Sequence, residues 1–271
     1  MSSGVKVLLV LLELLVTWDI SLSQPLLARS TYKGLRGVFL PSVKLRSADF
    51  KRAVYYHDQA VAVVDINENN EMLNCDIIEV YEPNEAGEVL GNLSISSHPT
   101  EIAFSQMTSL MYRCEMLDRI QRSQDKIKST PKGAFERANM FGTHALNLFS
   151  GILPGTKWCG TGDIAENYHD LGSDTEIDQC CRTHDLCPVK IRAQQNRYNL
   201  TNYSLYSKSH CDCDNAFYQC LKNLDSPTAS IMGKLYFNVV KVGCIEDLAE
   251  NINALSTMSP RRRFSATRLS F

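Results

Sequence analysis

The stretch DQCCRTHDLC (residues 178–187) places three cysteines and a His-Asp pair within ten residues. Cys180, His184 and Cys187 recur at spacings of four and three, which puts all three on one face of an α-helix. Pro188 follows directly and limits this helix, because proline lacks the N–H that a helix interior requires. The stretch therefore predicts a short helix that carries an imidazole between two cysteines.

A second stretch, CDCDNAFYQC (residues 211–220), repeats this interval. Cys213, Phe217 and Cys220 again share one helical face. Two antiparallel helices can be joined at both cysteine positions by disulfides about 10.5 Å apart, as the rise along a helix requires. The two bonds would be Cys180–Cys220 and Cys187–Cys213. A parallel arrangement satisfies the same spacing, so the spacing leaves the direction open.

The antiparallel arrangement would bring two polar side chains together. Asp214 on the second helix comes within reach of His184 on the first. A buried carboxylate beside an imidazole fixes the orientation of the ring and stabilises its charged form. Histidine and aspartate are poor core residues unless they are paired. We therefore expect a functional site here rather than a packing contact.

The composition is typical of an exported globular protein held by disulfides. Of the 271 residues, 44% are hydrophobic and ten are cysteines, eight of which lie at positions 159–244. This even count predicts a disulfide framework. The formal net charge of −2 gives no reason to expect a nucleic-acid partner. The alternative is a zinc site, which requires a reducing compartment and leaves cysteines over. Its candidate ligands are Cys180, Cys181, His184, Cys187, Cys211 and Cys213.

The N-terminus predicts secretion. Lys6 precedes the apolar block VLLVLLELLV (residues 7–16), and small residues follow at 21–23, so residues 1–23 are assigned to a signal peptide. The alternative is a short buried helix of a cytosolic protein. Sequons at Asn92, Asn199 and Asn202 agree with an extracellular location.

The distribution of cysteines divides the rest of the chain. Residues 24–150 form an N-terminal region or prosegment with only Cys75 and Cys114, which are expected to pair. Residues 53–66 predict strands around a His-Asp-Gln turn, residues 75–83 continue the strand character, and residues 107–120 have helical spacing, so this region is expected to be α+β. A polar linker is expected at 122–137, a cysteine-rich domain at 151–250, and a basic tail at 251–271. The tail is expected to be flexible, or else an anchor to an anionic surface.

The loop TKWCGTGD (residues 156–163) combines two glycines with a cysteine. Such a backbone can turn several carbonyl oxygens toward one point, and Ca²⁺ takes about 6–8 oxygen ligands. The carbonyls of Trp158, Gly160 and Gly162 alternate along the loop, and Asp185 can supply a carboxylate. These residues predict a calcium site; the alternative is a tight turn secured by a disulfide.

Four motifs together resemble the secreted phospholipases A2 of the bee-venom type, group III: WCGTGD, CCRTHDLCP, CDCDNAFYQCL and GKLYFNVV. The resemblance covers residues 152–244. It implies a mainly α, disulfide-rich fold with two antiparallel helices, a calcium-binding loop and a small β-hairpin. By this resemblance, the catalytic base is His184, its supporting carboxylate is Asp214, Tyr236 joins their network, and the calcium ligands are Trp158, Gly160, Gly162 and Asp185. The implied disulfides are Cys159–Cys181, Cys180–Cys220, Cys187–Cys213 and Cys211–Cys244.

Two features depart from the family pattern. The venom members carry a further C-terminal cysteine pair, whereas this sequence has no cysteine after Cys244. The N-terminal half is also far longer than a short propeptide. Both departures bear on regulation and on the approach of the substrate rather than on the site.

The activity that the resemblance implies is calcium-dependent hydrolysis of the sn-2 ester of glycerophospholipids, which releases a fatty acid and a lysophospholipid. The sequence has no G-x-S-x-G motif, so we expect His184 to activate water as the nucleophile. The expected partner is a phospholipid membrane or micelle, contacted through Ile152, Leu153 and Trp158, and the expected state is a monomer. The alternative is a catalytically inactive phospholipase-like module that binds a receptor or channel.

Overall fold

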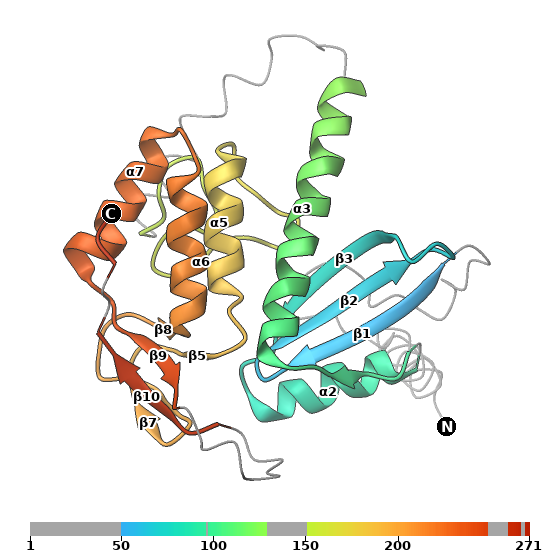
Figure 1. The fold of residues 1–271 in the computed structure, drawn as a ribbon, viewed down its shortest axis with the longest axis horizontal. Coiled ribbons are helices and arrows are strands. Elements are labelled where there is room, and N and C mark those ends of the chain that lie inside the picture. Colours follow the sequence, from blue (N-terminus) through green and yellow to red (C-terminus); the bar gives the residue numbers. More distant parts are fainter. Residues whose placement is uncertain (1–49, 96, 129–150, 249–259, 267–268) are drawn as a thin grey trace, which may run out of the picture.

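The computed structural model describes residues 50–95, 97–128, 151–248, 260–266 and 269–271 (Figure 1). The predicted signal peptide lies outside the described residues, and so does most of the predicted linker. Among the helices of the described ranges, none has the length and apolar character needed to cross a membrane.

A four-stranded sheet, in the order β3-β2-β1-β4, forms the base of the N-terminal region. β1 (Lys51–His57), β2 (Ala60–Ile66) and β3 (Met72–Glu79) are antiparallel neighbours, and the short β4 (Thr100–Glu101) pairs in parallel with β1. The strands predicted at 53–66 and after residue 75 are therefore confirmed. Both faces of β2 are covered, which explains its nearly continuous run of apolar residues.

Two helices cover opposite faces of this sheet (Figure 1). α2 (Pro83–Ser94) packs on one face and α3 (Phe104–Lys128) on the other. The expected Cys75–Cys114 disulfide joins β3 to α3. The helical spacing of residues 107–120 is confirmed, but α3 continues to its end at residue 128. The first half of the predicted linker is therefore helical.

The cysteine-rich half is built on α5 (Thr175–Asp185) and α6 (Cys211–Lys222), which lie side by side (Figure 1). Two disulfides connect them: Cys180 on α5 is bonded to Cys220 near the end of α6, and Cys187, two residues after α5, is bonded to Cys213 near the start of α6. The helices therefore run in opposite directions. α7 (Pro227–Gly233) packs against α6 and continues into the π-helical η2 (Lys234–Val240).

Short strand pairs complete this half. They are β5 (Lys190–Ile191) with β8 (Lys208–Ser209), β6 (Asn196–Arg197) with β7 (Leu200–Thr201), and β9 (Cys244–Asp247) with β10 (Arg262–Ser265). Together with the N-terminal sheet, they make the described chain α+β. The mainly α fold was expected for the cysteine-rich half alone, where helices form the centre and short strand pairs lie around them.

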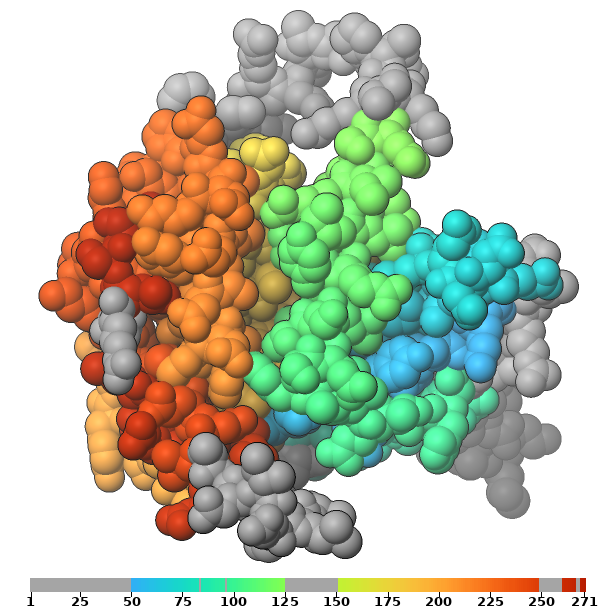
Figure 2. Space-filling view, viewed as in Figure 1, coloured from blue at the N-terminus to red at the C-terminus, as the bar shows by residue number. Residues whose placement is uncertain are grey.

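The two halves share one continuous hydrophobic core, which runs from the sheet through α3 to α5 and α6. In the space-filling view, α3 fills the space between the sheet and the cysteine-rich half (Figure 2). Members of this core from successive layers are Val64, Ile77, Met111, Ile177 and Phe217. The N-terminal region is thus packed into the same body as the cysteine-rich half.

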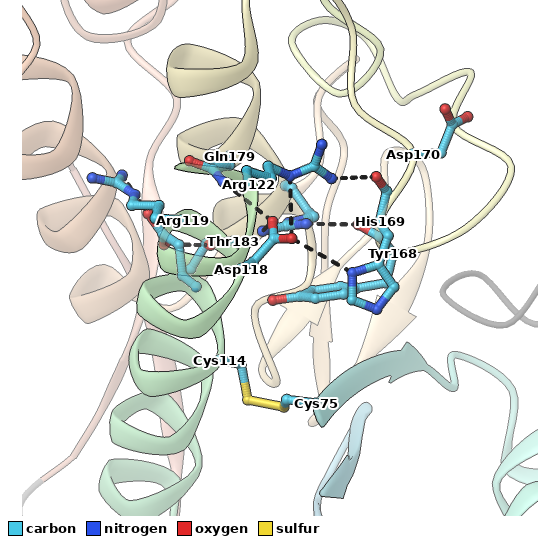
Figure 3. A network of polar contacts seen from close by, with 12 residues as sticks. Cys75, Cys114, Asp118, Arg119, Arg122, Tyr168, His169, Asp170, Gln179 and Thr183 are labelled. Atoms are coloured by element: carbon cyan, nitrogen blue, oxygen red, sulfur yellow. Dashed lines mark hydrogen bonds and ion pairs between the residues drawn. A yellow bond between two sulfur atoms is a disulfide. The ribbon is translucent and has the colours of Figure 1, made fainter. Parts of the chain in front are cut away.

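A polar network crosses the same boundary (Figure 3). Asp118 on α3 accepts hydrogen bonds from Arg182 at 3.0 Å and from Gln179 at 3.1 Å, and it lies 3.6 Å from Nδ1 of His169. Nε2 of His169 lies 2.9 Å from Asp76 on β3. The side chain of Arg182 is fully buried. Because a buried charge is costly unless it is paired, these contacts fix how α3 sits on α5.

The end of the chain is ordered where the structure describes it. β10 pairs with β9, and the buried Arg262 forms ion pairs with Asp58 at 3.0 Å and Asp247 at 2.9 Å. Asn238 holds the terminal Phe271 through two hydrogen bonds. The prediction of a flexible basic tail is therefore wrong for residues 260–266 and 269–271, because carboxylates and core contacts hold them. Residues 251–259 lie outside the described residues.

The three sequons differ in exposure. Asn92 and Asn199 are exposed, whereas Asn202 is fully buried. The Nδ2 group of Asn202 donates to the main-chain carbonyls of Ile191 at 3.1 Å and Tyr206 at 2.8 Å, as well as to that of Arg192. This amide holds together the loop that follows α5.

Candidate active site

The centre of the site is an imidazole between two helices. α5 carries His184, whose Nε2 lies 2.7 Å from Oδ1 of Asp214 on α6. The ring stacks on Phe217, with centroids 4.6 Å apart and an interplanar angle of 21°. The hydroxyl of Tyr236, on η2, donates to the same carboxylate oxygen at 3.1 Å. The three residues that the resemblance assigned to one network therefore lie together.

Burial determines the protonation state of Tyr236 in this network. Burial raises the pKa of Tyr236 well above its usual value, and the nearby Asp214 carboxylate adds to the effect. The phenol therefore stays protonated and remains a hydrogen-bond donor. Asp214 is itself buried, and a neutral His184 that donates from Nε2 to this carboxylate presents Nδ1 as an acceptor.

A cavity of about 480 Å³ opens beside His184. Its wall is shared by α5, α6, the glycine-rich loop and the segment after α5. The predicted calcium ligands Trp158, Gly160, Gly162 and Asp185 all line this cavity. The structure thus brings every predicted site residue to one place.

Hydrogen bonds and one glycine conformation hold the loop whose backbone carbonyls are the predicted calcium ligands. The carbonyls of Lys157 and Cys159 accept hydrogen bonds from the main-chain N–H groups of Ile164 and Leu153. Gly162 has φ of 96°, a conformation that favours glycine. Backbone carbonyl oxygens and a carboxylate are ligands that suit a hard cation such as Ca²⁺.

The cysteines exclude one of the alternatives. The structure contains Cys159–Cys181 and Cys211–Cys244 in addition to the two bonds between α5 and α6, which are the four pairs that the resemblance implies. With Cys75–Cys114, these bonds use all ten cysteines. The zinc interpretation is therefore wrong, because no thiolate is left to bind a metal.

Asp178 also shapes the site, although the motifs of the sequence predict no role for it. This buried carboxylate on α5 accepts hydrogen bonds from the main-chain N–H groups of Trp158 at 2.7 Å, Lys157 at 2.9 Å and Gly172 at 2.8 Å. Burial raises its pKa, and the three N–H groups oppose this shift. A carboxylate in the first turn of a helix usually serves as a cap, so nothing in the sequence singled it out.

Of the three residues expected to enter a lipid surface, only Leu153 is partly exposed where it lines the cavity. Ile152 and Trp158 are 3% and 1% exposed, so they cannot insert into a membrane, and that expectation is wrong for them. Leu205, Leu235 and Tyr206 line the same cavity and are 80%, 43% and 40% exposed. They form an apolar rim. Their spacing has no regular period, which is why the sequence did not reveal it.

Comparisons with known proteins agree with the site. A family model described as phospholipase A2 matches residues 152–248. Acidic phospholipase A2 PA4 of Heloderma suspectum is 44% identical over 95 residues, which are 35% of this chain and 67% of the relative. A phospholipase A2 of Apis cerana cerana is 43% identical over 34% of this chain and 70% of its own length.

A human relative is much longer. Group 3 secretory phospholipase A2 of Homo sapiens is 43% identical over 38% of this chain but only 20% of its own length. The family model does not extend to the described N-terminal residues 50–128. The geometry of the site and the matched relatives lead to the same conclusion. The chain belongs to the phospholipase A2 family, in its group III branch.

Proposed function

We propose that this chain is a secreted, calcium-dependent phospholipase A2 that hydrolyses the sn-2 ester of glycerophospholipids. The observation that supports this most directly is the 2.7 Å contact between His184 and Asp214 at the wall of a cavity that Asp185 and the glycine-rich loop also line. This arrangement combines a proton acceptor with a cluster of oxygen donors.

His184 acts as the general base. Asp214 holds Nε2, so Nδ1 takes a proton from water, and the water oxygen attacks the ester carbonyl carbon. When the bond between this carbon and the glycerol oxygen breaks, His184 returns the proton to that oxygen. The products are a fatty acid and a lysophospholipid. All cysteines are in disulfides, so no thiolate competes as a nucleophile.

The carbonyls of Trp158, Gly160 and Gly162 and the carboxylate of Asp185 would hold calcium. When bound, Ca²⁺ supplies positive charge for the substrate phosphate and for the oxyanion that develops in the transition state. Asp178 and the Cys159–Cys181 bridge fix the loop before substrate arrives, so little reorganisation is needed at the moment of reaction.

The substrate is taken from a phospholipid membrane or micelle. Leu205, Leu235 and Tyr206 surround the cavity with exposed apolar surface, which favours contact with the interfacial region of a lipid layer. The relatives and the five disulfides support an extracellular location.

The test is release of fatty acid from phosphatidylcholine vesicles labelled at the sn-2 position. Wild type is expected to release the label with calcium and not with excess chelator. A folded chain that releases nothing under either condition would support the inactive binding module instead. Release of the label at the same rate in calcium and in excess chelator would contradict the proposed role of the glycine-rich loop in holding calcium.

A further inference from the structure

The N-terminal sheet reaches the active-site cavity. Glu79, the last residue of β3, lines the same cavity as His184 and Asp185. Its side chain is only 3% exposed. Because the family model begins at residue 152, this carboxylate comes from a part of the chain outside the matched phospholipase domain.

Glu79 holds two cations of the cysteine-rich half. Its Oε1 lies 2.5 Å from Nζ of Lys190, which is 7% exposed, and its Oε2 lies 3.2 Å from Arg192. Removing one partner of a buried ion pair leaves an uncompensated charge, which is strongly unfavourable. The position of the Lys190 ammonium is therefore tied to the position of Glu79.

Lys190 connects Glu79 to the proposed calcium site. Its ammonium also donates a hydrogen bond to the main-chain carbonyl of Asp185. Asp185 is the last residue of α5, where carbonyls lack partners within the helix and attract positive charge. The ammonium thus sits between a carboxylate of the N-terminal sheet and the backbone of the proposed calcium ligand.

The β1–β2 turn also holds the segment that follows α5. The main-chain N–H of Gln59 donates to the carbonyl of Pro188 at 3.0 Å, and its side-chain amide donates to the carbonyl of Lys190 at 2.7 Å. Gln59 is 1% exposed. The segment that leaves α5 is therefore held both by the β1–β2 turn, through its backbone, and by β3, through the side chain of Lys190.

We propose that Glu79 is a positioning residue for the calcium site, acting through Lys190 on Asp185. The N-terminal region then forms part of the working enzyme, because it fixes the end of α5 and the carboxylate there. This inference rests on the proposed calcium function of Asp185.

The first test compares full-length wild type with Glu79→Gln by calorimetric titration with Ca²⁺. The substitution is expected to weaken calcium binding by about ten-fold or more, as is typical when a residue that orients a ligand is lost. Activity at saturating calcium should recover most of the wild-type rate. Asp65→Asn is the matched control, because it removes a buried carboxylate of the same sheet that pairs with Arg52. It should leave calcium affinity unchanged.

The second test is a double-variant cycle with Lys190→Met. If Glu79 acts through Lys190, then Glu79→Gln should add little to the loss of affinity already caused by Lys190→Met. Fully additive losses would overturn the proposed route. Glu79→Asp keeps the charge but shortens the side chain, and it should give an intermediate affinity if Glu79→Gln fails to fold.

The outcomes separate this inference from the proposed function. Calcium binding of wild-type strength in Glu79→Gln would overturn the inference and leave the calcium site in place. Absence of calcium binding in wild type would overturn both.

Discussion

Asp178 and Trp158 are joined by a 2.7 Å hydrogen bond from the main-chain N–H of Trp158 to the carboxylate of Asp178. Since the N–H of Trp158 faces α5, this contact fixes the plane of the adjoining peptide group in the glycine-rich loop. A buried side chain on α5 thus sets the orientation of backbone groups in the proposed metal site.

Asp178→Asn is expected to lower the free energy of unfolding by roughly 2–3 kcal/mol, because one carboxylate satisfies three main-chain donors and an amide cannot replace it. Chemical denaturation of the disulfide-intact protein measures this loss. Glu176→Gln, an exposed change in the same helical turn, is the control and should have little effect. Equal free energies of unfolding for the two variants would contradict the structural role of the Asp178 carboxylate.

His184→Gln is expected to reduce turnover by about 10²–10⁴-fold, because the base is lost while the disulfides keep the fold. Tyr236→Phe is the comparison: it removes one hydrogen bond to Asp214 but leaves the His184–Asp214 contact, so the loss should stay below about ten-fold. Release of labelled fatty acid measures both, and melting curves verify the fold. Near-normal turnover in His184→Gln would rule out its role as base.

Stability is expected to fall in alkaline solution because of His169. Burial disfavours its charged form, but the carboxylates of Asp118 and Asp76 outweigh this effect and raise its pKa to about 9. The stabilisation from the imidazolium is therefore fully present below the unfolded pKa of about 6.5, and it is lost as the pH rises through about 9.

Melting temperatures between pH 6 and pH 10 measure this dependence. His169→Gln should flatten the curve, whereas substitution of the exposed His98 should leave it unchanged. An identical pH profile in wild type and His169→Gln would show that the ion pairs of His169 do not contribute to the pH dependence of stability.

Calcium is expected to raise the melting temperature, since a ligand at 100 times its dissociation constant stabilises the folded state by about 2.7 kcal/mol. Asp185→Asn should abolish most of this shift, and magnesium should reproduce little of it because it tolerates irregular cages poorly. A calcium-induced shift that survives in Asp185→Asn would locate the ion elsewhere.

Cutting the chain between residues 137 and 152 is expected to leave the N-terminal region attached. The shared core and the Arg182–Asp118 ion pair hold the two halves without a covalent bond between them. An inserted protease site and size-exclusion chromatography test this: the two pieces should elute together with unchanged activity. Separate elution with increased activity would instead identify a prosegment.

The sequence predicted those helices and strands whose residues repeat at a regular spacing along the chain. The seven-residue interval between cysteines predicted α5 and α6, and the apolar run at 53–66 predicted β1 and β2. The motif resemblance selected His184, Asp214 and Tyr236, which lie together in the fold. In each case neighbouring residues, or a compact motif, carried the information.

Contacts between distant segments left no such signal. Glu79 and Lys190 are separated by more than a hundred residues, and neither belongs to a recognisable motif. The run Arg261–Arg263 has the composition of a solvated tail, but Asp58 and Asp247 compensate the buried Arg262. Partners of this kind are determined by how the two halves pack, and that packing has no sequence period.

The buried amide of Asn202 has a consequence for biosynthesis. Its nitrogen is committed to three main-chain carbonyls, so an oligosaccharide attached there would prevent the loop from closing. In a chain secreted as we propose, modification of this sequon would therefore compete with folding. Mature molecules should carry sugar only at the exposed acceptors, and any chain glycosylated at Asn202 should be retained by quality control rather than exported.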